Sequence, residues 1–156
     1  MVTLPIINNN LFMNCLLKQN LFDTFEVREV TLHTSYKMHL DGRRNTDFYD
    51  DMESEGRSEC QGLSEYLSWS ELKPHIFELI KGTKSPTYLK IILSTSPLKT
   101  QEISEEASTF FLNITYKEGA ISCITGTAYA SFSLDKTPEQ AWDQKMTKFL
   151  ISNNLL

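Results

Sequence analysis

Apolar residues cover most sides of the first predicted helix, which spans residues 9–19. Asn10, Asn14 and Lys18 recur at intervals of four and form a single polar stripe along this helix. A helix this apolar is expected to be buried on more than one side. The alternative is that it docks onto a second subunit.

Two more helices carry start signals as well as an apolar period. The segment 69–81 is preceded by Ser68 and has Glu71 three residues after that serine, which is the pattern of a capping box. Near the end of the chain, Thr137-Pro138-Glu139-Gln140 predicts a second capping box with proline in the first turn. The residues expected on the buried face of this last helix are Trp142, Met146, Phe149 and Leu150.

Alternation of apolar and polar residues predicts strands elsewhere. Residues 24–32 and 35–41 form two of them, and a slip in the pattern near Arg28 indicates a bulge. The link between these strands lacks Gly or Asn-Gly, so one long bent strand is an alternative. Further strands are predicted at about 89–93, 110–116 and 124–132, with a polar connection over 97–106.

Together these elements predict an α+β protein. We expect a mostly antiparallel sheet of about five strands, with two or three helices packed mainly on one face. A length of 156 residues suits one domain, and no repeat or interdomain linker divides the chain. The sequence therefore predicts a single domain over residues 1–156.

The stretch from residue 47 to residue 71 is strongly acidic, since eight Asp and Glu residues stand against the single Arg57. Within it, residues 50–62 show no hydrophobic period. Ordering this part would cost backbone entropy with little apolar area to offset the loss. We therefore predict a flexible acidic loop at 50–62.

Deleting residues 50–62 is expected to leave the melting temperature nearly unchanged, because the segment brings little apolar surface to the core. Thermal denaturation followed by circular dichroism checks this prediction. A large drop in melting temperature would mean that the segment packs against the domain.

Composition and charge indicate the environment and the partners. A net charge of −5 and a pI near 5.2 disfavour binding to nucleic acid or to an anionic membrane. Cys15, Cys60 and Cys123 form no CxxC pair and fit reduced thiols in a cytoplasm. The first ten residues do not resemble a signal peptide, and no stretch is long enough to span a bilayer. We expect a cytoplasmic protein that does not enter a membrane.

Familiar catalytic and metal-binding patterns are missing from the sequence. Residues 51–62 match the first positions of a calcium loop, but Gly62 stands where a bidentate glutamate is required. His33, His39 and His75 have no partner at ligand spacing, so no metal or other cofactor is predicted. No nucleophile–base motif, phosphate-binding loop or nucleotide fingerprint occurs in the sequence. We therefore assign no catalytic residue and favour a protein that is not an enzyme.

Several short motifs are shared with a known family. They are Asp41-Gly42-Arg43, Tyr66-Leu67-Ser68-Trp69-Ser70-Glu71-Leu72-Lys73-Pro74, Leu79-Ile80-Lys81-Gly82, Thr125-Gly126-Thr127 and Ala141-Trp142-Asp143. With these motifs the chain resembles an uncharacterised domain-of-unknown-function family of small single-domain proteins from clostridial Firmicutes. The resemblance implies a bacterial cytosolic protein. Because that family has no assigned activity, it supplies no site residues.

The residues at both ends of the acidic stretch are the candidates for contact with a ligand or partner. They are Arg43, Asp47, Tyr49, Glu71 and His75. Phe48 and Tyr49 stand directly before Asp50 and Asp51. An aromatic pair beside acids is typical of a segment that folds on a partner, although a hydrophobic anchor at the end of a strand is the simpler interpretation. We predict a non-catalytic interaction module that binds a protein partner, or self-associates through an open sheet edge or the first helix.

Two other functions stay open at this point. One is a small-ligand-binding protein or unrecognised enzyme, with a pocket between the sheet and the 69–81 helix. The other is a nucleic-acid binder, which the negative net charge disfavours. Its contact residues would be Arg43, Arg44, Lys81, Lys84, Lys90 and Lys99, with Tyr36, Tyr49 or Tyr88 for stacking.

Overall fold

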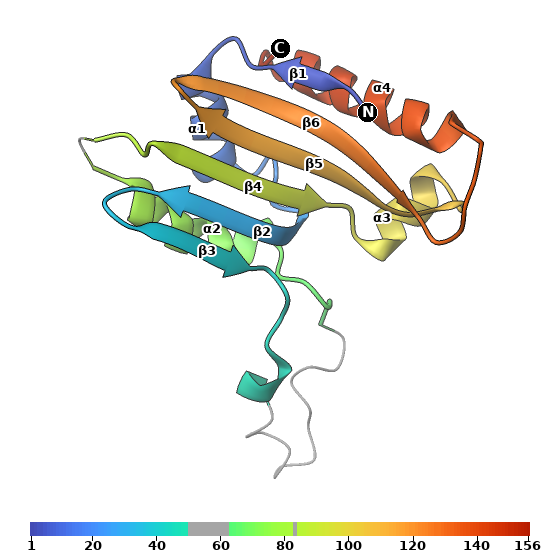
Figure 1. Cartoon of the computed structure of the whole chain (residues 1–156), viewed down its shortest axis with the longest axis horizontal. Helices are drawn as coiled ribbons and strands as arrows, with labels where there is room; N and C mark the ends of the chain where they lie inside the picture. The colour runs from blue at the N-terminus through green and yellow to red at the C-terminus, as the bar shows by residue number, and fades with distance from the viewer. Residues whose placement is uncertain (50–62, 83) are drawn as a thin grey trace.

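One antiparallel sheet forms the centre of the protein (Figure 1). The computed structural model describes residues 1–49, 63–82 and 84–156. In this part of the chain the sheet has six strands in the order β1-β6-β5-β4-β2-β3. The strands are β1 (Thr3–Pro5), β2 (Glu26–His33), β3 (Lys37–Asp41), β4 (Tyr88–Ser94), β5 (Ala107–Lys117) and β6 (Ala120–Tyr129).

Helices cover only one face of this sheet. They are α1 (Asn9–Leu17), α2 (Trp69–Ile80), α3 (Pro97–Ile103) and α4 (Thr137–Ser152). In Figure 1, α1, α2 and α4 lie behind the strands, and α3 sits at one end of the sheet. The face toward the viewer carries no helix from the described residues.

Strict alternation along the strands produces the core, because every second side chain points toward the helices. The inward residues of β4 and β5 are at most 1% exposed: Leu89, Ile91, Leu93, Phe110, Leu112 and Ile114. Trp69 of α2 and Trp142 of α4 close this core from the helical side. Their indole N–H groups donate to the carbonyls of Leu16 at 2.7 Å and Phe111 at 2.9 Å. Both tryptophans are thus buried without an unpaired donor.

The predicted elements of the first half of the chain are confirmed. β2 and β3 form a hairpin with Thr31 opposite His39, so the alternative of one long bent strand is wrong. The register between β2 and β4 shifts between Val27 and Glu29, which confirms the bulge. At the start of α2, the backbone N–H of Ser68 donates to the carboxylate of Glu71 at 2.8 Å, as the capping box predicted.

Two short elements correct the sequence-based picture of about five strands and two or three helices. β1 has three residues and pairs only with β6, so it is too short to show an alternating pattern. The predicted polar connection over 97–106 contains α3, a helix of seven residues. Ser96 caps it by accepting from the N–H of Lys99, and Pro97 occupies its first turn. Six strands and four helices therefore replace the smaller numbers for the described residues.

The predicted capping box at the start of α4 is also wrong. Thr137 is the first helical residue, and the side chain of Asp135 takes over the cap by accepting from the backbone N–H of Thr137 at 2.9 Å and from its hydroxyl at 2.6 Å. Glu139 instead contacts the terminal amine of Met1 and lies 3.4 Å from Lys136 Nζ. Two cations therefore compete successfully for the carboxylate that a capping box would need.

Residues 50–62, where the flexible acidic loop and the calcium-like pattern fall, lie outside the described residues. Among the helices that are described, none is both long enough and apolar enough to cross a membrane.

Candidate functional site

Arg44 brings two of the five predicted site residues together. Its side chain is only 5% exposed and binds the Glu71 carboxylate in a fork, with N–O distances of 3.1 and 3.0 Å. The same guanidinium donates to the Tyr49 hydroxyl at 3.2 Å and to the Ser64 carbonyl at 2.9 Å. Chain segments that precede and follow the acidic stretch thus meet at one buried arginine.

The electrostatics at Arg44 are those of a structural ion pair. Its hydrogen bonds hold the pKa of the Glu71 carboxyl below the ordinary value, and the N–H of Ser68 acts in the same direction. Glu71 in turn raises the pKa of Arg44. Both groups stay charged across the physiological range, so neither is suited to proton transfer.

Replacing Arg44 with methionine is expected to cost about 1–2 kcal/mol of unfolding free energy. The loss is below that of a fully buried ion pair because the Glu71 side chain is 43% exposed and can be hydrated. Urea denaturation of Arg44→Met measures it. Arg43→Met is the matched control, since the Arg43 side chain is 62% exposed and should change stability by less than about 0.5 kcal/mol. Equal losses in the two variants would contradict the anchoring role of Arg44.

Arg43 lies beside this anchor but points into solvent. Its guanidinium donates to the Tyr66 hydroxyl at 3.2 Å and lies 3.6 Å from the Glu65 carboxylate. Arg28 stacks on the same ring, with its guanidinium carbon 3.7 Å from the Tyr66 centroid. Arg28 also donates to the Ser94 hydroxyl at 2.9 Å. Two arginines are therefore held at the edge of the sheet by one tyrosine.

The remaining two predicted residues are not part of this cluster. Asp47 is exposed in the turn after β3, next to Phe48, which is 76% exposed. His75 is exposed on α2. Within the described residues, the side chains of Asp47 and His75 form no hydrogen bond or ion pair. Tyr49 and Glu71 meet at Arg44 and Arg43 lies beside them, whereas the roles of all five in contact with a partner stay predictions.

A buried carboxyl, Glu26, was missed by the sequence reasoning. It is 6% exposed at the start of β2, and no described residue forms a hydrogen bond or ion pair with its carboxyl group. Desolvation raises its pKa; the charge of Arg28 opposes this effect and that of Glu65 adds to it. Its neighbours in sequence, Phe25 and Val27, mark it only as the polar member of an alternating strand, so no local signal indicated its burial.

Glu26→Gln is expected to stabilise the protein by about 1 kcal/mol near pH 7.5. Because the folded-state pKa of Glu26 is raised, its contribution to stability is present at low pH and is lost as the pH rises through that pKa. The gain from glutamine should therefore vanish below about pH 4, where the carboxyl is protonated in both states. Urea denaturation at the two pH values checks this, with Glu105→Gln, at an exposed position before β5, as control. A gain that is the same at both pH values would contradict the assignment.

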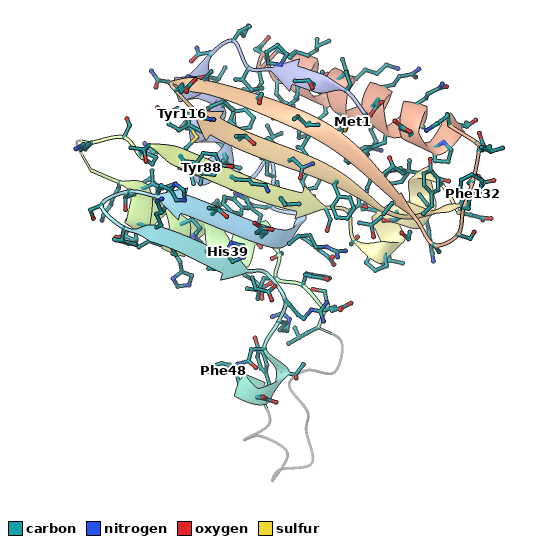
Figure 2. All side chains as sticks on the ribbon, viewed as in Figure 1. Met1, His39, Phe48, Tyr88, Tyr116 and Phe132 are labelled. Carbon is teal, nitrogen blue, oxygen red and sulfur yellow. The ribbon has the colours of Figure 1, made fainter. Side chains whose placement is uncertain are left out.

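The side of the sheet that no described helix covers begins beside this cluster, at Arg28, and we call it the open face. Cross-strand pairing aligns its side chains in rows, such as Thr31, Lys90, Thr115 and Ser122. Tyr88 lies on this face in Figure 2. The outward residues of β2, β4, β5 and β6 that define the open face are Glu26, Arg28, Glu29, Thr31, His33, Tyr88, Lys90, Ile92, Ser94, Thr109, Phe111, Asn113, Thr115, Lys117, Ala120, Ser122, Ile124, Gly126 and Ala128.

Charge is distributed unevenly over the open face. Its positions on β4, β5 and β6 include Lys90 and Lys117 and no acidic residue, although the chain has 20 acidic residues in all. Tyr88 and the ring of Phe111 are half-buried there, in company with Ile92. The acids of this face lie toward the β3 edge, where Glu29 accepts from Thr31 at 3.4 Å. Three of the six strands thus present a neutral-to-positive, partly aromatic surface.

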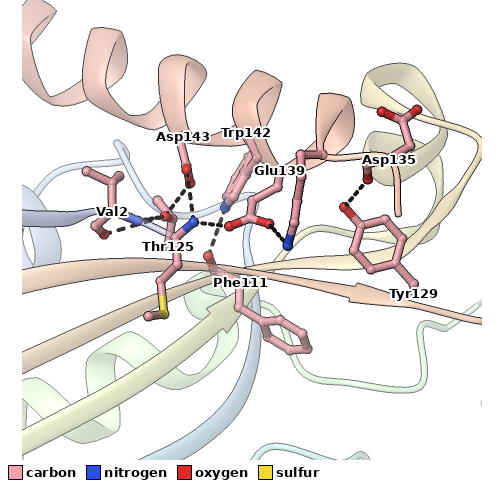
Figure 3. A network of polar contacts seen from close by, with 10 residues as sticks. Val2, Phe111, Thr125, Tyr129, Asp135, Glu139, Trp142 and Asp143 are labelled. Atoms are coloured by element: carbon pink, nitrogen blue, oxygen red, sulfur yellow. Dashed lines mark hydrogen bonds and ion pairs between the residues drawn. The ribbon is translucent and has the colours of Figure 1, made fainter. Parts of the chain in front are cut away.

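A second polar network lies at the opposite edge of the sheet (Figure 3). The buried hydroxyl of Thr125 bonds the Asp143 carboxylate of α4 at 2.5 Å and accepts from the N–H of Val2 at 2.8 Å. The terminal amine of Met1 is 3.0 Å from Asp143 and also contacts Glu139. These contacts fasten β1 and α4 to β6, which is a structural role.

Reactive thiols and metal ligands are not assembled in the described part of the chain. Burial raises the pKa of Cys123 to about 12, and burial also raises the pKa of Cys15. Neither thiol is therefore a nucleophile near neutral pH. No group of three or more His, Cys, Asp or Glu side chains there could hold a metal ion.

The space between the sheet and α2 is filled by Trp69, Leu72 and Ile76, all of them buried. Of five cavities lined by described residues, none includes any of the predicted site residues.

Comparison with known proteins identifies the family. A family model described as a family of unknown function (DUF5721) matches residues 15–156, so the chain belongs to that family. The match confirms the resemblance to an uncharacterised family. No curated protein and no solved structure matches the chain.

Proposed function

We propose that the chain is a non-catalytic binding module of the bacterial cytoplasm that meets a protein partner through its open face. The observation that carries this proposal is the acid-free surface of β4, β5 and β6 in a protein with a net charge of −5. Partly exposed aromatic and aliphatic side chains provide apolar contact area, and Lys90 and Lys117 favour an acidic partner surface.

A sheet edge is a poorer contact than the face. The outer strands of the described sheet are β1 and β3, with three and five residues. β1 ends in Pro5, and the solvent side of β3 carries Lys37, His39 and Asp41. Short, charged or proline-containing edge strands are the usual protection against pairing with another sheet. The first helix is also a poor contact, because Phe12, Cys15 and Leu16 are buried within their own chain.

A second copy of the chain is the first partner to test, because the chain carries its own acidic stretch over residues 47–71. Light scattering from low to several hundred micromolar should show self-association that high salt weakens. Capture experiments with the immobilised protein test whether it binds acidic proteins other than a second copy of itself. The double variant Lys90→Glu/Lys117→Glu is expected to lose the interaction in either assay.

Lys148→Glu is the control, since Lys148 is exposed on α4, on the opposite side of the sheet. It should retain whatever the native protein binds. The proposal fails if the native protein is monomeric throughout and both variants capture the same proteins as it does.

Single-stranded nucleic acid is the second candidate for the open face. Lysines interspersed with aromatic rings, here Lys90 with Tyr88 and Phe111, are features of surfaces that stack bases and contact phosphates. The net charge of the chain opposes such binding. Fluorescence anisotropy with a labelled single-stranded oligonucleotide distinguishes the candidates. Steeply salt-dependent binding of the oligonucleotide that is lost in Lys90→Glu/Lys117→Glu would identify nucleic acid, and not a protein, as the ligand of the open face. If the oligonucleotide does not bind, nucleic acid is excluded.

A further inference from the structure

A separate cavity of about 220 Å³ lies on the helical side of the sheet. Three chain segments enclose it: the connection between α1 and β2, the start and end of α3, and the middle of α4. α3 and α4 lie at the same end of the sheet in Figure 1. The cavity is therefore remote from the open face, which is on the other side of the strands.

Aromatic side chains form one wall of the cavity. Phe25 contacts Trp142 and Phe149 edge-on, with ring centroids 6.5 and 6.4 Å apart. The indole N–H of Trp142 is already bound to the Phe111 carbonyl, so this residue offers the cavity only apolar surface. Ile103 of α3 completes an apolar lining that suits a hydrocarbon chain or an aromatic ring.

Two cations and no acid line this cavity. Lys99 and Lys145 reach it from α3 and α4, and both are exposed at its rim. Lys99 lies 3.1 Å from Glu102, which is itself solvent-exposed. Lys145 has no hydrogen-bond or ion-pair partner among the described residues. Two ammonium groups beside an apolar wall favour a ligand with an apolar body and a negative end.

We propose that this cavity binds a small carboxylic acid with an aliphatic or aromatic body, such as a medium-chain fatty acid or an arylalkanoic acid. The apolar body lies against Phe25, Trp142 and Phe149, and the carboxylate lies between Lys99 and Lys145. The cavity is smaller than the roughly 300–1,000 Å³ that holds drug-sized ligands, which excludes cofactors of nucleotide size. This proposal does not depend on the proposed function, because no residue that lines the cavity belongs to the open face.

Indole N–H signals in the NMR spectrum of the full ¹⁵N-labelled protein provide the test. The chain has two tryptophans: Trp142 lines the cavity, and Trp69 lies in the core beneath α2. Titration with octanoate and with 3-phenylpropanoate should shift the Trp142 signal saturably and leave the Trp69 signal unchanged. The neutral analogues octanol and 3-phenylpropanol should bind at least about tenfold more weakly.

Lysine variants separate recognition of the carboxylate from unspecific apolar binding. Lys99→Met/Lys145→Met should weaken binding of both carboxylates about tenfold, while Lys148→Met on the same helix should leave it unchanged. The proposal is overturned if Trp142 does not respond at millimolar ligand, if both indole signals move together, or if the neutral analogues bind as well as the acids. Failure here with an intact open-face interaction would leave the proposed function standing.

Discussion

Gly42→Ala is expected to destabilise the protein by about 3 kcal/mol or more, enough to unfold a marginal domain. A Cβ atom at Gly42 would lie 1.9 Å from the carbonyl oxygen of Val27 and 2.5 Å from its carbonyl carbon. Both obstacles are backbone atoms of the β2 bulge, so no side-chain rotation relieves the clash. Urea denaturation, or loss of the cooperative thermal transition, measures the effect.

The position explains why the clash is severe. The Gly42 N–H donates to the Arg28 carbonyl at 3.0 Å, and its own carbonyl accepts from the N–H of Leu67 at 2.9 Å. Three segments therefore meet at a residue without a side chain: the end of β3, the bulge of β2 and the chain before α2. Shifting the backbone to admit a methyl group would break these hydrogen bonds.

Gly119→Ala is the control for this prediction. Gly119 occupies the turn between β5 and β6 with φ of 77°, and nothing lies within 4 Å of an added Cβ atom. The substitution should cost only the strain of a left-handed alanine, about 1 kcal/mol. Equal and small losses at Gly42 and Gly119 would contradict the close approach of Gly42 to the Val27 carbonyl of the β2 bulge.

Trp69→Ala is expected to cost about 3–5 kcal/mol, because it removes a fully buried indole from the sheet–α2 interface. The substitution leaves a cavity and also removes the donor to the Leu16 carbonyl, which ties α2 to α1. Chemical denaturation of the variant measures the loss. Trp69→Phe should recover about half of it, since the ring is kept and the hydrogen bond is not.

Leu79→Ala on the same helix provides the comparison. Leu79 is 36% exposed near the end of α2, so its replacement by alanine should lower the free energy of unfolding by less than about 1 kcal/mol. If Trp69→Ala were no more harmful than Leu79→Ala, the assignment of α2 as a core helix would be untenable.

Elements with a long, regular period could be predicted from the sequence. α2 shows an apolar stripe together with a cap at Ser68 and Glu71, and these local signals agree with its packing. The hairpin and its bulge could be predicted because the alternation in β2 slips at Arg28, one residue out of register with the rest. A period averages over many residues, so single exceptions do not hide it.

Short elements and long-range contacts could not be predicted in this way. β1 has three residues and exists because β6 supplies a pairing partner more than a hundred residues away. The cap of α4 depends on Asp135 and on cations that compete for Glu139, and a motif of four residues contains neither. Tertiary partners decide such features, and a single sequence does not reveal them.

The same difference between local sequence signals and long-range contacts applies to the candidate site. The sequence indicated Tyr49 and Glu71 because they lie at the two ends of the acidic stretch, and the structure brings them together at Arg44. The sequence named Arg44 only among six basic residues that could contact nucleic acid, whereas the structural role of Arg44 follows from its contacts with Ser64 and Glu71, 20 and 27 residues away. The open face was equally hidden, because an alternating strand predicts that one side is polar but does not predict which side the helices leave uncovered.

Hydroxyl-radical footprinting of Tyr88 and Phe111 tests most directly whether the open face is a free binding surface. In dilute monomer both rings should react, while the buried ring of Trp69 should not. Addition of the captured partner, or concentration of the protein if it self-associates, should protect both rings. Rings that are already protected in the dilute monomer, or that react equally in the complex, would contradict a binding role for this face.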